Sequence, residues 1–377
     1  MYSESDIEAA VASGAITPQA AAALRNSVAS SRAAPAVDEE SFRLITGFND
    51  IFVTIAAMLL LVAVGWIGSA LGGAIVAAPF MLDYTDPVEV AQMQRHIAAG
   101  ATVAGLAVAA VSWLLAEYFT RKRRMALPSI FLLLTFALGV GGAIAGLLGA
   151  ASSTLDARHQ ALVSAMAALV TAGATYAHWR RFHVPITIAA LTCALAATLV
   201  SLVMAAIPAT REAWLFVLML AGLAIFSFAM WWDVSDRQRQ TRRSDVAFWL
   251  HLVAAPMIAH PVFNLLGVTA DRVGIVTGLA VILLYILFGI VALAVDRRAL
   301  LVSSLFYVLF ALASLFESVG AVSLNIALTA LVIGSALLLL SAFWHGARRL
   351  VVTRLSPALR DRLPVLDRPL LVTPRPA

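Results

Sequence analysis

Apolar runs of about 20 residues recur along almost the whole chain, and they constrain the fold more than any other feature. A helix of that length crosses the ~30 Å hydrocarbon core of a bilayer. Hydrophobic residues make up 62% of the 377 residues and charged residues only 12%, whereas soluble domains are about half apolar and a quarter charged. The sequence therefore predicts an all-α fold: a polytopic bundle of transmembrane helices embedded in a lipid bilayer.

About ten spans are expected. They cover residues 51–72, 97–119, 127–150, 159–178, 184–207, 212–232, 246–267, 273–295, 299–317 and 321–344. Three regions follow: a small cytoplasmic helical hairpin and linker at 1–40, a transmembrane domain at 41–347, and an Arg- and Pro-rich cytoplasmic tail at 348–377. The composition of the tail predicts an irregular segment from Arg348 onward. The largest outer connection is expected at about residues 73–96.

Basic residues alternate from one connection to the next. Of the 26 basic residues, 22 fall in the two termini and four Arg-rich connections, and 4 fall in the other connections. The positive-inside rule places the rich side, with both termini, in the cytoplasm. About 50 mostly polar residues precede the first apolar run, so a cleaved signal peptide is not expected. The doublets point to anchoring on anionic inner-leaflet lipids rather than to nucleic-acid binding.

The basic doublets also recur at intervals of 51–62 residues. They are Arg123-Arg124, Arg180-Arg181, Arg242-Arg243, Arg297-Arg298 and Arg348-Arg349. One interpretation is a helical hairpin copied along the chain. The other is that selection for positive charge placed each doublet independently. The sequence leaves both open.

The soluble N-terminal region is predicted to be a helical hairpin. Gly14 breaks the first helix, and Thr17 followed by Pro18 is typical of an N-cap with proline at the first helical position. Helices this short are marginal alone. We expect the hairpin to dock on a protein partner, on itself or on the membrane face.

Polar residues inside spans are the main functional candidates, and the seventh predicted span contains the clearest ones. His260 is predicted near the bilayer centre, and Asn264 follows one turn later on the same helix face. Pro256 and Pro261 remove backbone donors and predict a broken helix. The alternative is a neutral histidine bonded to a neighbouring backbone carbonyl, with the prolines accommodated as kinks.

A substrate-binding cavity formed by His260, Asn264, Tyr285 and Asn325 is the resulting site hypothesis. Tyr307 and Thr329 are further polar groups in the same region. Ordinary hydrogen bonds between helices would explain all of them equally well.

Other chemistry is not expected from the sequence. His251 is nine residues before His260 and faces another direction, so the two do not share a metal on a straight helix. The single Cys193 cannot form an intrachain disulfide. Asp233 is assigned to a cytoplasmic helix end. We expect no cofactor, no metal and no catalytic group. The pairs Gly68-x3-Gly72 and Gly142-x3-Gly146 predict close helix packing.

Two stretches carry a resemblance to known sequences. Gly14–Ala20, before a linker and a many-helix block, resembles a bacterial family of polytopic inner-membrane proteins of undefined function with an N-terminal cytoplasmic hairpin. Thr241–Asn264 is similar to related inner-membrane proteins. The resemblance implies a multi-pass protein of the bacterial inner membrane and supplies no catalytic residues.

Two function classes stay open. A transporter or channel-like protein for a small or apolar solute is favoured by about ten spans and a kinked helix bearing His260. A membrane scaffold or sensor subunit, engaging a partner through the hairpin and tail, is favoured by the scarcity of polar groups within the spans. An intramembrane enzyme would need more catalytic groups than one deep histidine.

Overall fold

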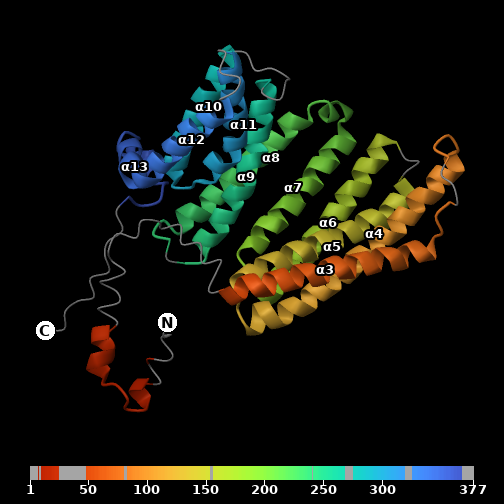
Figure 1. Cartoon of the computed structure of the whole chain (residues 1–377), viewed down its shortest axis with the longest axis horizontal. Helices are drawn as coiled ribbons and strands as arrows, with labels where there is room; N and C mark the ends of the chain where they lie inside the picture. The colour runs from red at the N-terminus through yellow and green to blue at the C-terminus, as the bar shows by residue number, and fades with distance from the viewer. Residues whose placement is uncertain are drawn as a thin grey trace. The chain divides into compact units, whose positions relative to one another are not determined.

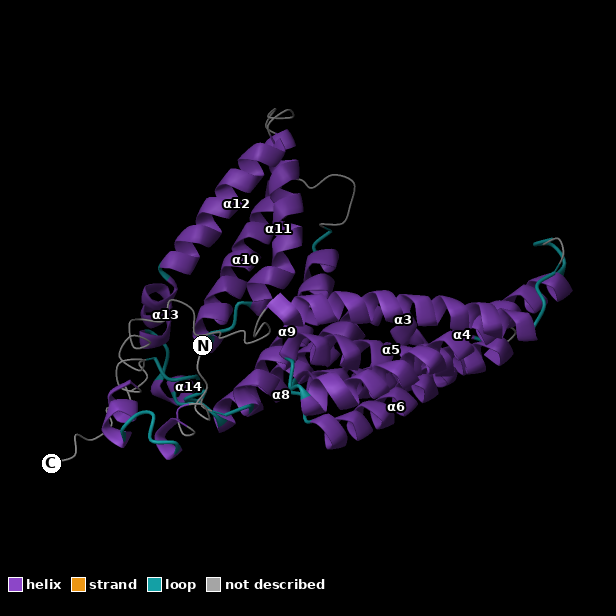
Figure 2. Cartoon of the chain, turned by 60° about the horizontal axis from the view of Figure 1, so that its bottom comes forward, coloured by secondary structure: helices purple, strands orange, loops and turns teal. Residues whose placement is uncertain are grey.

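The computed structural model describes residues 7, 10–24, 48–79, 83–152, 156–239, 241–267, 275–318 and 325–366. Every regular element in these ranges is a helix (Figures 1 and 2), which confirms the all-α prediction for the described residues. The chain divides into two compact units. One contains Met1–Leu44 and Asp367–Ala377, and the other contains Ile45–Leu366.

The first unit contains the predicted hairpin. Residues 10–12 and 18–24 are helical, and a tight turn separates them. Gly14 lies in this turn with a φ of 74°, a conformation that glycine adopts without steric strain. The Oγ1 atom of Thr17 accepts a hydrogen bond from the amide of Ala20 at 3.1 Å, as an N-cap residue does. The predicted break and cap are confirmed.

In the described part of the second unit, nine helices are long and apolar enough to cross a bilayer. They are α3 (Phe48–Ile75), α4 (Pro87–Ala116, continued by a π-helical stretch to Lys122), α5 (Ala126–Ser152), α6 (Ala157–Phe182), α7 (Ile186–Ala206), α8 (Trp214–Ser235), α9 (Arg243–Leu265), α10 (Ile275–Val295) and α11 (Ala299–Ser318). Short connections fold most of them back on their neighbours in sequence (Figure 1). The protein is an integral multi-pass membrane protein.

The tenth predicted span corresponds to α12 (Asn325–Ala342), which ends at a bend of 75° before α13 (Trp344–Thr353). The buried residues of α13 are Trp344, Arg348 and Val352, which are four residues apart and so share one helix face. Trp344 and Val352 pack against residues of α10. α13 is therefore an amphipathic helix lying against the bundle, and the described chain has nine spans, or ten when α12 and α13 are counted as one.

The tail differs from the prediction. Instead of an irregular segment from Arg348, α13 continues to Thr353, α14 covers Pro357–Arg360, and the compact unit ends at Leu366. Arg348 and Leu363 are buried, so this part of the chain packs on the bundle. Arginine and proline content alone predicts solvent exposure and does not reveal such packing. We call residues 344–366 the C-terminal segment.

The predicted outer connection is also shorter than expected, because both flanking helices continue beyond the hydrocarbon length. α3 has 28 residues and α4 has 30. Only residues 76–86 connect them. Asp86 caps α4 by accepting from the amide of Val88 at 2.8 Å, and Nδ1 of His96 lies 2.6 Å from the carbonyl oxygen of Val76. The contact of His96 with Val76 ties α4 to the end of α3, and the Asp86 bond caps α4.

Glycines allow the backbones of α3, α4 and α5 to touch. An added Cβ at Gly68 would lie 2.7 Å from the Cα of Ala104, and Gly72 is similarly close to Ala99, so this predicted pair is confirmed. The second predicted pair is half wrong. A Cβ added at Gly142 would meet no atom of another helix within 4 Å. A Cβ added at Gly139 would lie 2.8 Å from the carbonyl oxygen of Gly105. The helix face turned toward α4 therefore contains Gly139 and Gly146.

A tight turn with the same backbone feature recurs in all four Arg-rich connections. Each contains one non-glycine residue with positive φ: Arg124 (54°), His183 (53°), Arg239 (54°) and Asp296 (60°). These residues follow one another at intervals of 59, 56 and 57. The next helix begins within four residues of this position each time. This regularity favours the copied-hairpin interpretation over independent placement of each doublet.

An ion pair recurs at twice that interval. Glu117, which follows α4, binds Arg181 of α6, and Asp233 of α8 binds Arg297, which follows α10. Each pair joins residues 64 apart, and the second pair lies 116 residues after the first. We therefore call α4–α7 the first repeat and α8–α11 the second repeat. The first pair joins the first and second Arg-rich connections, and the second pair joins the third and fourth. We call the four Arg-rich connections the Arg-rich end.

Candidate functional site

Charged side chains are buried at the Arg-rich end of the second repeat. Asp233 is 1% exposed. Its Oδ1 atom accepts a hydrogen bond from Nη2 of Arg297 at 2.6 Å, and its Oδ2 atom lies 2.9 Å from Nε2 of His251, on α9. Arg297 also donates to the carbonyl oxygen of Ser244, at the start of α9, at 3.0 Å. One carboxylate thus ties together α8, α9 and the turn between α10 and α11.

The chemistry of Asp233 fixes how His251 is protonated. An ionised carboxylate only accepts hydrogen bonds, so Nε2 of His251 carries the shared proton. The other ring nitrogen, Nδ1, is buried and has no hydrogen-bond partner in the described part of the chain. The ring packs edge-on against Phe226 with 5.0 Å between centroids. Asp233 and Arg297 balance each other's charge, the condition under which ions are tolerated inside a protein.

A second group of polar contacts centres on Asp296, the residue before Arg297. Nη1 of Arg239 donates to Oδ2 of Asp296 at 2.9 Å, and Nε1 of Trp344 donates to Oδ1 of the same residue at 2.8 Å. Arg348 lies 3.5 Å from that carboxylate. Burial by itself raises the pKa of Asp296, but Arg239, Arg348 and the Trp344 hydrogen bond outweigh it, so the pKa lies below its ordinary value. Burial lowers the pKa of Arg239 to about 10, which leaves it charged at neutral pH.

These side chains form two neighbouring groups, one around Asp233 and one around Asp296, which are linked through the consecutive residues Asp296 and Arg297 and which we together call the buried ion network. Its members are Asp233, Arg239, His251, Asp296, Arg297, Trp344 and Arg348. Within the described residues, no three side chains of the types His, Cys, Asp and Glu lie close enough to hold a metal ion. The arrangement can hold charges in place and join helices.

The network extends to the end of the compact unit. Nη2 of Arg348 donates to the carbonyl oxygen of Pro364 at 2.8 Å, and Nη1 donates to that of Val365 at 3.2 Å. Nε of Arg237 donates to the carbonyl oxygen of Leu363 at 2.9 Å. The side chain of Leu363 packs in a hydrophobic cluster with Val295 of α10. The C-terminal segment is therefore clamped to the second repeat by polar and apolar contacts.

The first repeat carries the same ion pair in a different environment. The side chains of Glu117 and Arg181 are 29% and 41% exposed, whereas those of Asp233 and Arg297 are 1% and 5% exposed. The C-terminal segment packs over residues at the ends of α8 and α10 in the second repeat. The deeper burial of the second pair coincides with this cover.

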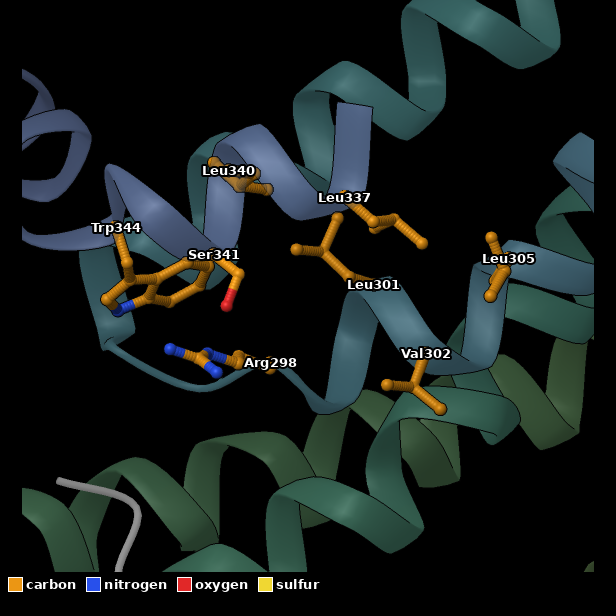
Figure 3. Close-up of a pocket in the computed structure, with 8 residues that line it drawn as sticks. All are labelled: Arg298, Leu301, Val302, Leu305, Leu337, Leu340, Ser341 and Trp344. Carbon is orange, nitrogen blue, oxygen red and sulfur yellow. The ribbon is translucent and has the colours of Figure 1, made fainter. Parts of the chain in front are cut away.

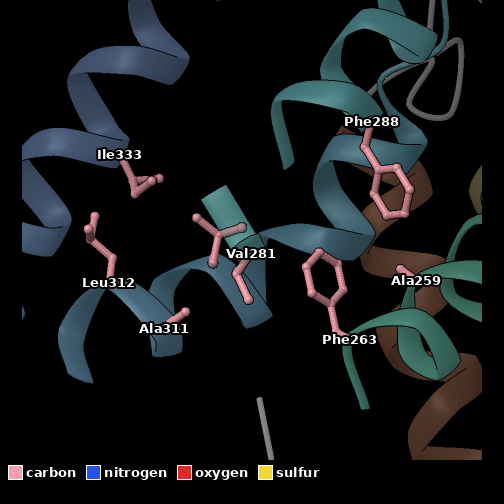
Figure 4. Packing of buried hydrophobic residues seen from close by; sticks show 8 residues of the cluster. Ala259, Phe263, Val281, Phe288, Ala311, Leu312 and Ile333 are labelled. Atoms are coloured by element: carbon pink, nitrogen blue, oxygen red, sulfur yellow. The ribbon is translucent and has the colours of Figure 1, made fainter. Parts of the chain in front are cut away.

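His260 of α9 contacts one of the polar side chains named for its region. Its Nδ1 atom lies 2.6 Å from the hydroxyl oxygen of Tyr307, on α11. The ring of Trp214 lies 6.0 Å from that of His260, and Phe263 stacks on Tyr307 at 4.8 Å. These rings border a hydrophobic cluster in which Phe263 packs with residues of α10, α11 and α12 (Figure 4). Among the polar groups named for this region, Tyr307 hydrogen-bonds to His260.

The other three predicted members of the site are Asn264, Tyr285 and Asn325. Asn264 is half-buried one turn after His260. Tyr285 packs against the same hydrophobic cluster, and its buried hydroxyl has no hydrogen-bond partner among the described residues. Asn325 begins α12, and its side chain lies outside the described part of the chain.

The expectation of a broken helix at α9 requires correction. The helix runs from Arg243 to Leu265 through Pro256 and Pro261 without a break, because a transmembrane helix accommodates proline by local adjustment. His260 is six residues beyond the middle of this helix, which is about 9 Å along its axis, so it lies closer to the end than to the centre. His251 and His260 bond to different helices, as their different directions predict.

The buried ion network is hard to predict because each member has an ordinary explanation when taken alone. Asp233 follows an apolar run as a helix-end carboxylate, and Arg297 belongs to a positive doublet. The available signal is the shared spacing of 64 residues in Glu117–Arg181 and Asp233–Arg297. Without contacts, that spacing does not distinguish an ion pair from coincidence.

The contribution of Asp296 to stability depends on pH. Its folded-state pKa lies below its ordinary value, so it stabilises the fold above the unfolded pKa of about 3.9 and loses this contribution as the pH falls through the folded pKa. Asp296→Asn keeps the size of the side chain and tolerates positive φ, so it removes mainly the charge. Between about pH 5 and pH 3, we expect the thermal midpoint to fall more steeply in the wild-type protein than in Asp296→Asn. Parallel curves would contradict this assignment.

Removing the hydroxyl of Tyr307 and removing that of Tyr285 are expected to have different effects on the stability of the protein. Tyr307→Phe leaves Nδ1 of His260 without its partner and should lower stability by about 0.5–1.5 kcal/mol. Tyr285→Phe removes a buried hydroxyl without a described partner, so it should be neutral or stabilising. Thermal midpoints of the two variants in the same detergent test this difference. A larger loss in Tyr285→Phe contradicts the assigned hydrogen bonding.

Comparisons of the chain with protein-family models, with curated proteins and with solved structures gave no match. The likeness carried by Gly14–Ala20 and Thr241–Asn264 therefore stays a resemblance. What is established is the broader class of polytopic helical membrane protein.

Proposed function

We propose that the protein is a membrane scaffold or sensor subunit rather than an enzyme, and that its C-terminal segment and N-terminal hairpin engage a protein partner. The observation that carries this proposal is the buried ion network, which fixes the C-terminal segment to the second repeat through Asp296, Trp344 and Arg348.

The energetics of the network support this interpretation. Removing an ion from water costs several kcal/mol, and attraction between partners offsets that only in good geometry. Buried ionic groups are best attested where they specify one arrangement of helices or one register. A surface that recognises a partner benefits from keeping one shape, since ordering it on binding reduces affinity. Clamping a surface segment by Arg348 and Arg237 provides that rigidity.

The clamped segment also presents apolar side chains. Leu350 is 54% exposed and Leu359 is 51% exposed. The positive-inside rule supports placing this Arg-rich end in the cytoplasm, and the resemblance of Gly14–Ala20 supports a bacterial inner membrane. A cytoplasmic partner would then meet Leu350 and Leu359 on a fixed surface.

Site-specific photo-crosslinking in intact cells tests the scaffold proposal. A photoreactive residue at Leu359 should give one discrete adduct with another protein, whereas the same residue at Leu279 of α10, which is 52% exposed, should meet mainly lipid. Arg348→Gln should abolish the Leu359 adduct while the protein still reaches the membrane. Absence of a discrete Leu359 adduct, or an unchanged adduct in Arg348→Gln, counts against the proposal.

Transport is the second candidate, and the His260–Tyr307 contact between α9 and α11 is the observation that favours it. A half-buried titratable ring beside two prolines could relay a proton. Purified protein in vesicles loaded with a pH-sensitive dye tests this with protons as the probe. Flux above that of empty vesicles, lost in both His260→Phe and Tyr307→Phe, supports transport. Flux equal to that of empty vesicles removes proton transport by this site.

A further inference from the structure

An apolar groove lies between the start of α11 and the junction of α12 with α13 (Figure 3). Its volume is about 110 Å³, and it is open on one side. Its lining residues are Arg298, Leu301, Val302, Leu305, Leu337, Leu340, Ser341 and Trp344. Only Arg298 and Ser341 have polar side chains apart from the indole nitrogen of Trp344, which hydrogen-bonds to Asp296.

The position of the groove identifies what surrounds it. α11 is a transmembrane helix, and Val302, at the groove, is 64% exposed. Leu338 and Leu339 of α12, next to the groove residues, are 74% and 59% exposed. In a multi-pass membrane protein such exposed aliphatic surface faces acyl chains. The groove is therefore open to lipid along its leucine-lined part.

The polar end of the groove is cationic. The guanidinium carbon of Arg298 lies 4.8 Å from the centre of the Trp344 ring, over its face. Stacking uses the face of the guanidinium, whose five N–H donors lie in its plane, so an arginine can bind a phosphate while it keeps another partner. Arg298 follows α10 at the Arg-rich end, so it stands at the level where lipid headgroups begin.

We propose that this groove binds one anionic phospholipid, with its phosphate at Arg298 and one acyl chain along Leu301, Leu305 and Leu337. Charge complementarity selects the headgroup, because a basic site between membrane helices favours anionic lipids. The leucine side chains that line the groove favour an acyl chain. The proposal is independent of whether the protein acts as a scaffold or a transporter.

Native mass spectrometry of the full-length protein tests the site. Protein released from nanodiscs containing equal amounts of phosphatidylglycerol and phosphatidylcholine should retain phosphatidylglycerol preferentially. Arg298→Gln should reduce the ratio of retained phosphatidylglycerol to phosphatidylcholine about fivefold. Arg243→Gln, an exposed arginine at the same end, should leave the ratio unchanged.

A second variant separates the groove from surface charge. Leu337→Trp fills the groove from α12 and keeps Arg298, so it should also reduce the retained phosphatidylglycerol. The proposal is overturned if Arg298→Gln keeps the wild-type ratio, if Arg243→Gln lowers it equally, or if Leu337→Trp retains the lipid as the wild-type protein does.

Discussion

Replacing Asp233 with alanine is expected to destabilise the protein by about 3–5 kcal/mol, because it leaves Arg297 buried without its counter-charge. The same change also removes the partner of Nε2 of His251. The loss should appear as a much lower thermal midpoint, measured by size-exclusion chromatography of detergent-purified protein after heating.

The first repeat supplies a matched control. Glu117→Ala removes the corresponding carboxylate, and Arg181 remains partly in solvent. Water and salt screen an exposed charge, so this variant should keep a thermal midpoint close to that of the wild-type protein. If Glu117→Ala and Asp233→Ala lowered the midpoint equally, the difference in burial would not control stability.

A double variant separates loss of the pair from loss of one partner. Asp233→Leu with Arg297→Met replaces both charges by apolar side chains of comparable volume. Such replacements of buried ion pairs are often neutral. We therefore expect the double variant to be more stable than either single variant. A double variant at least as unstable as the sum of the two single changes would contradict an unpaired charge as the cause.

The second large effect is expected at the contact between α4 and α5. A Cβ added at Gly139 would lie 2.8 Å from the carbonyl oxygen of Gly105 and 2.9 Å from the amide nitrogen of Ala109. Both atoms belong to the backbone, so the helices must separate to admit a methyl group. Gly139→Ala should therefore destabilise the protein by about 1–3 kcal/mol through overpacking.

Gly142 is the control on the same helix, because a Cβ there would meet nothing within 4 Å. Gly142→Ala should be neutral or slightly stabilising, since alanine has the higher helix propensity. Thermal midpoints of the two variants, measured side by side, check the packing. Equal effects would mean that the helix face containing Gly139 is assigned incorrectly.

The transmembrane elements were largely predictable because length and hydropathy are local properties of the sequence. The predicted span 184–207 matches α7 (Ile186–Ala206) closely. The change of helix direction after Phe343, where α13 bends away from α12, was not predictable in this way. α13 turns aside because Trp344, Arg348 and Val352 find buried positions against α10, and such tertiary contacts leave little trace in local composition.

The candidate site was less predictable for a related reason. Arg297 and Arg298 are adjacent, and the sequence predicts the same role for both, as anchors at the inner leaflet. In the structure, Arg297 pairs with buried Asp233, and Arg298 stacks on Trp344. Likewise, His251 and His260 stand on one helix, but His251 meets a carboxylate and His260 meets a phenol. Charge counting predicts the side of the membrane, while partners depend on which helices become neighbours.

The clamping of the C-terminal segment is the central claim, and a distance between two spin labels tests it most directly. In a Cys193→Ala background, labels are attached through Arg243→Cys at the start of α9 and Leu359→Cys in the C-terminal segment, both exposed. Double electron–electron resonance in nanodiscs should give one narrow distance distribution. Adding Arg237→Gln and Arg348→Gln, which weakens the bonds to Leu363, Pro364 and Val365, should broaden it. A broad distribution in the labelled protein that keeps both arginines would contradict the clamp.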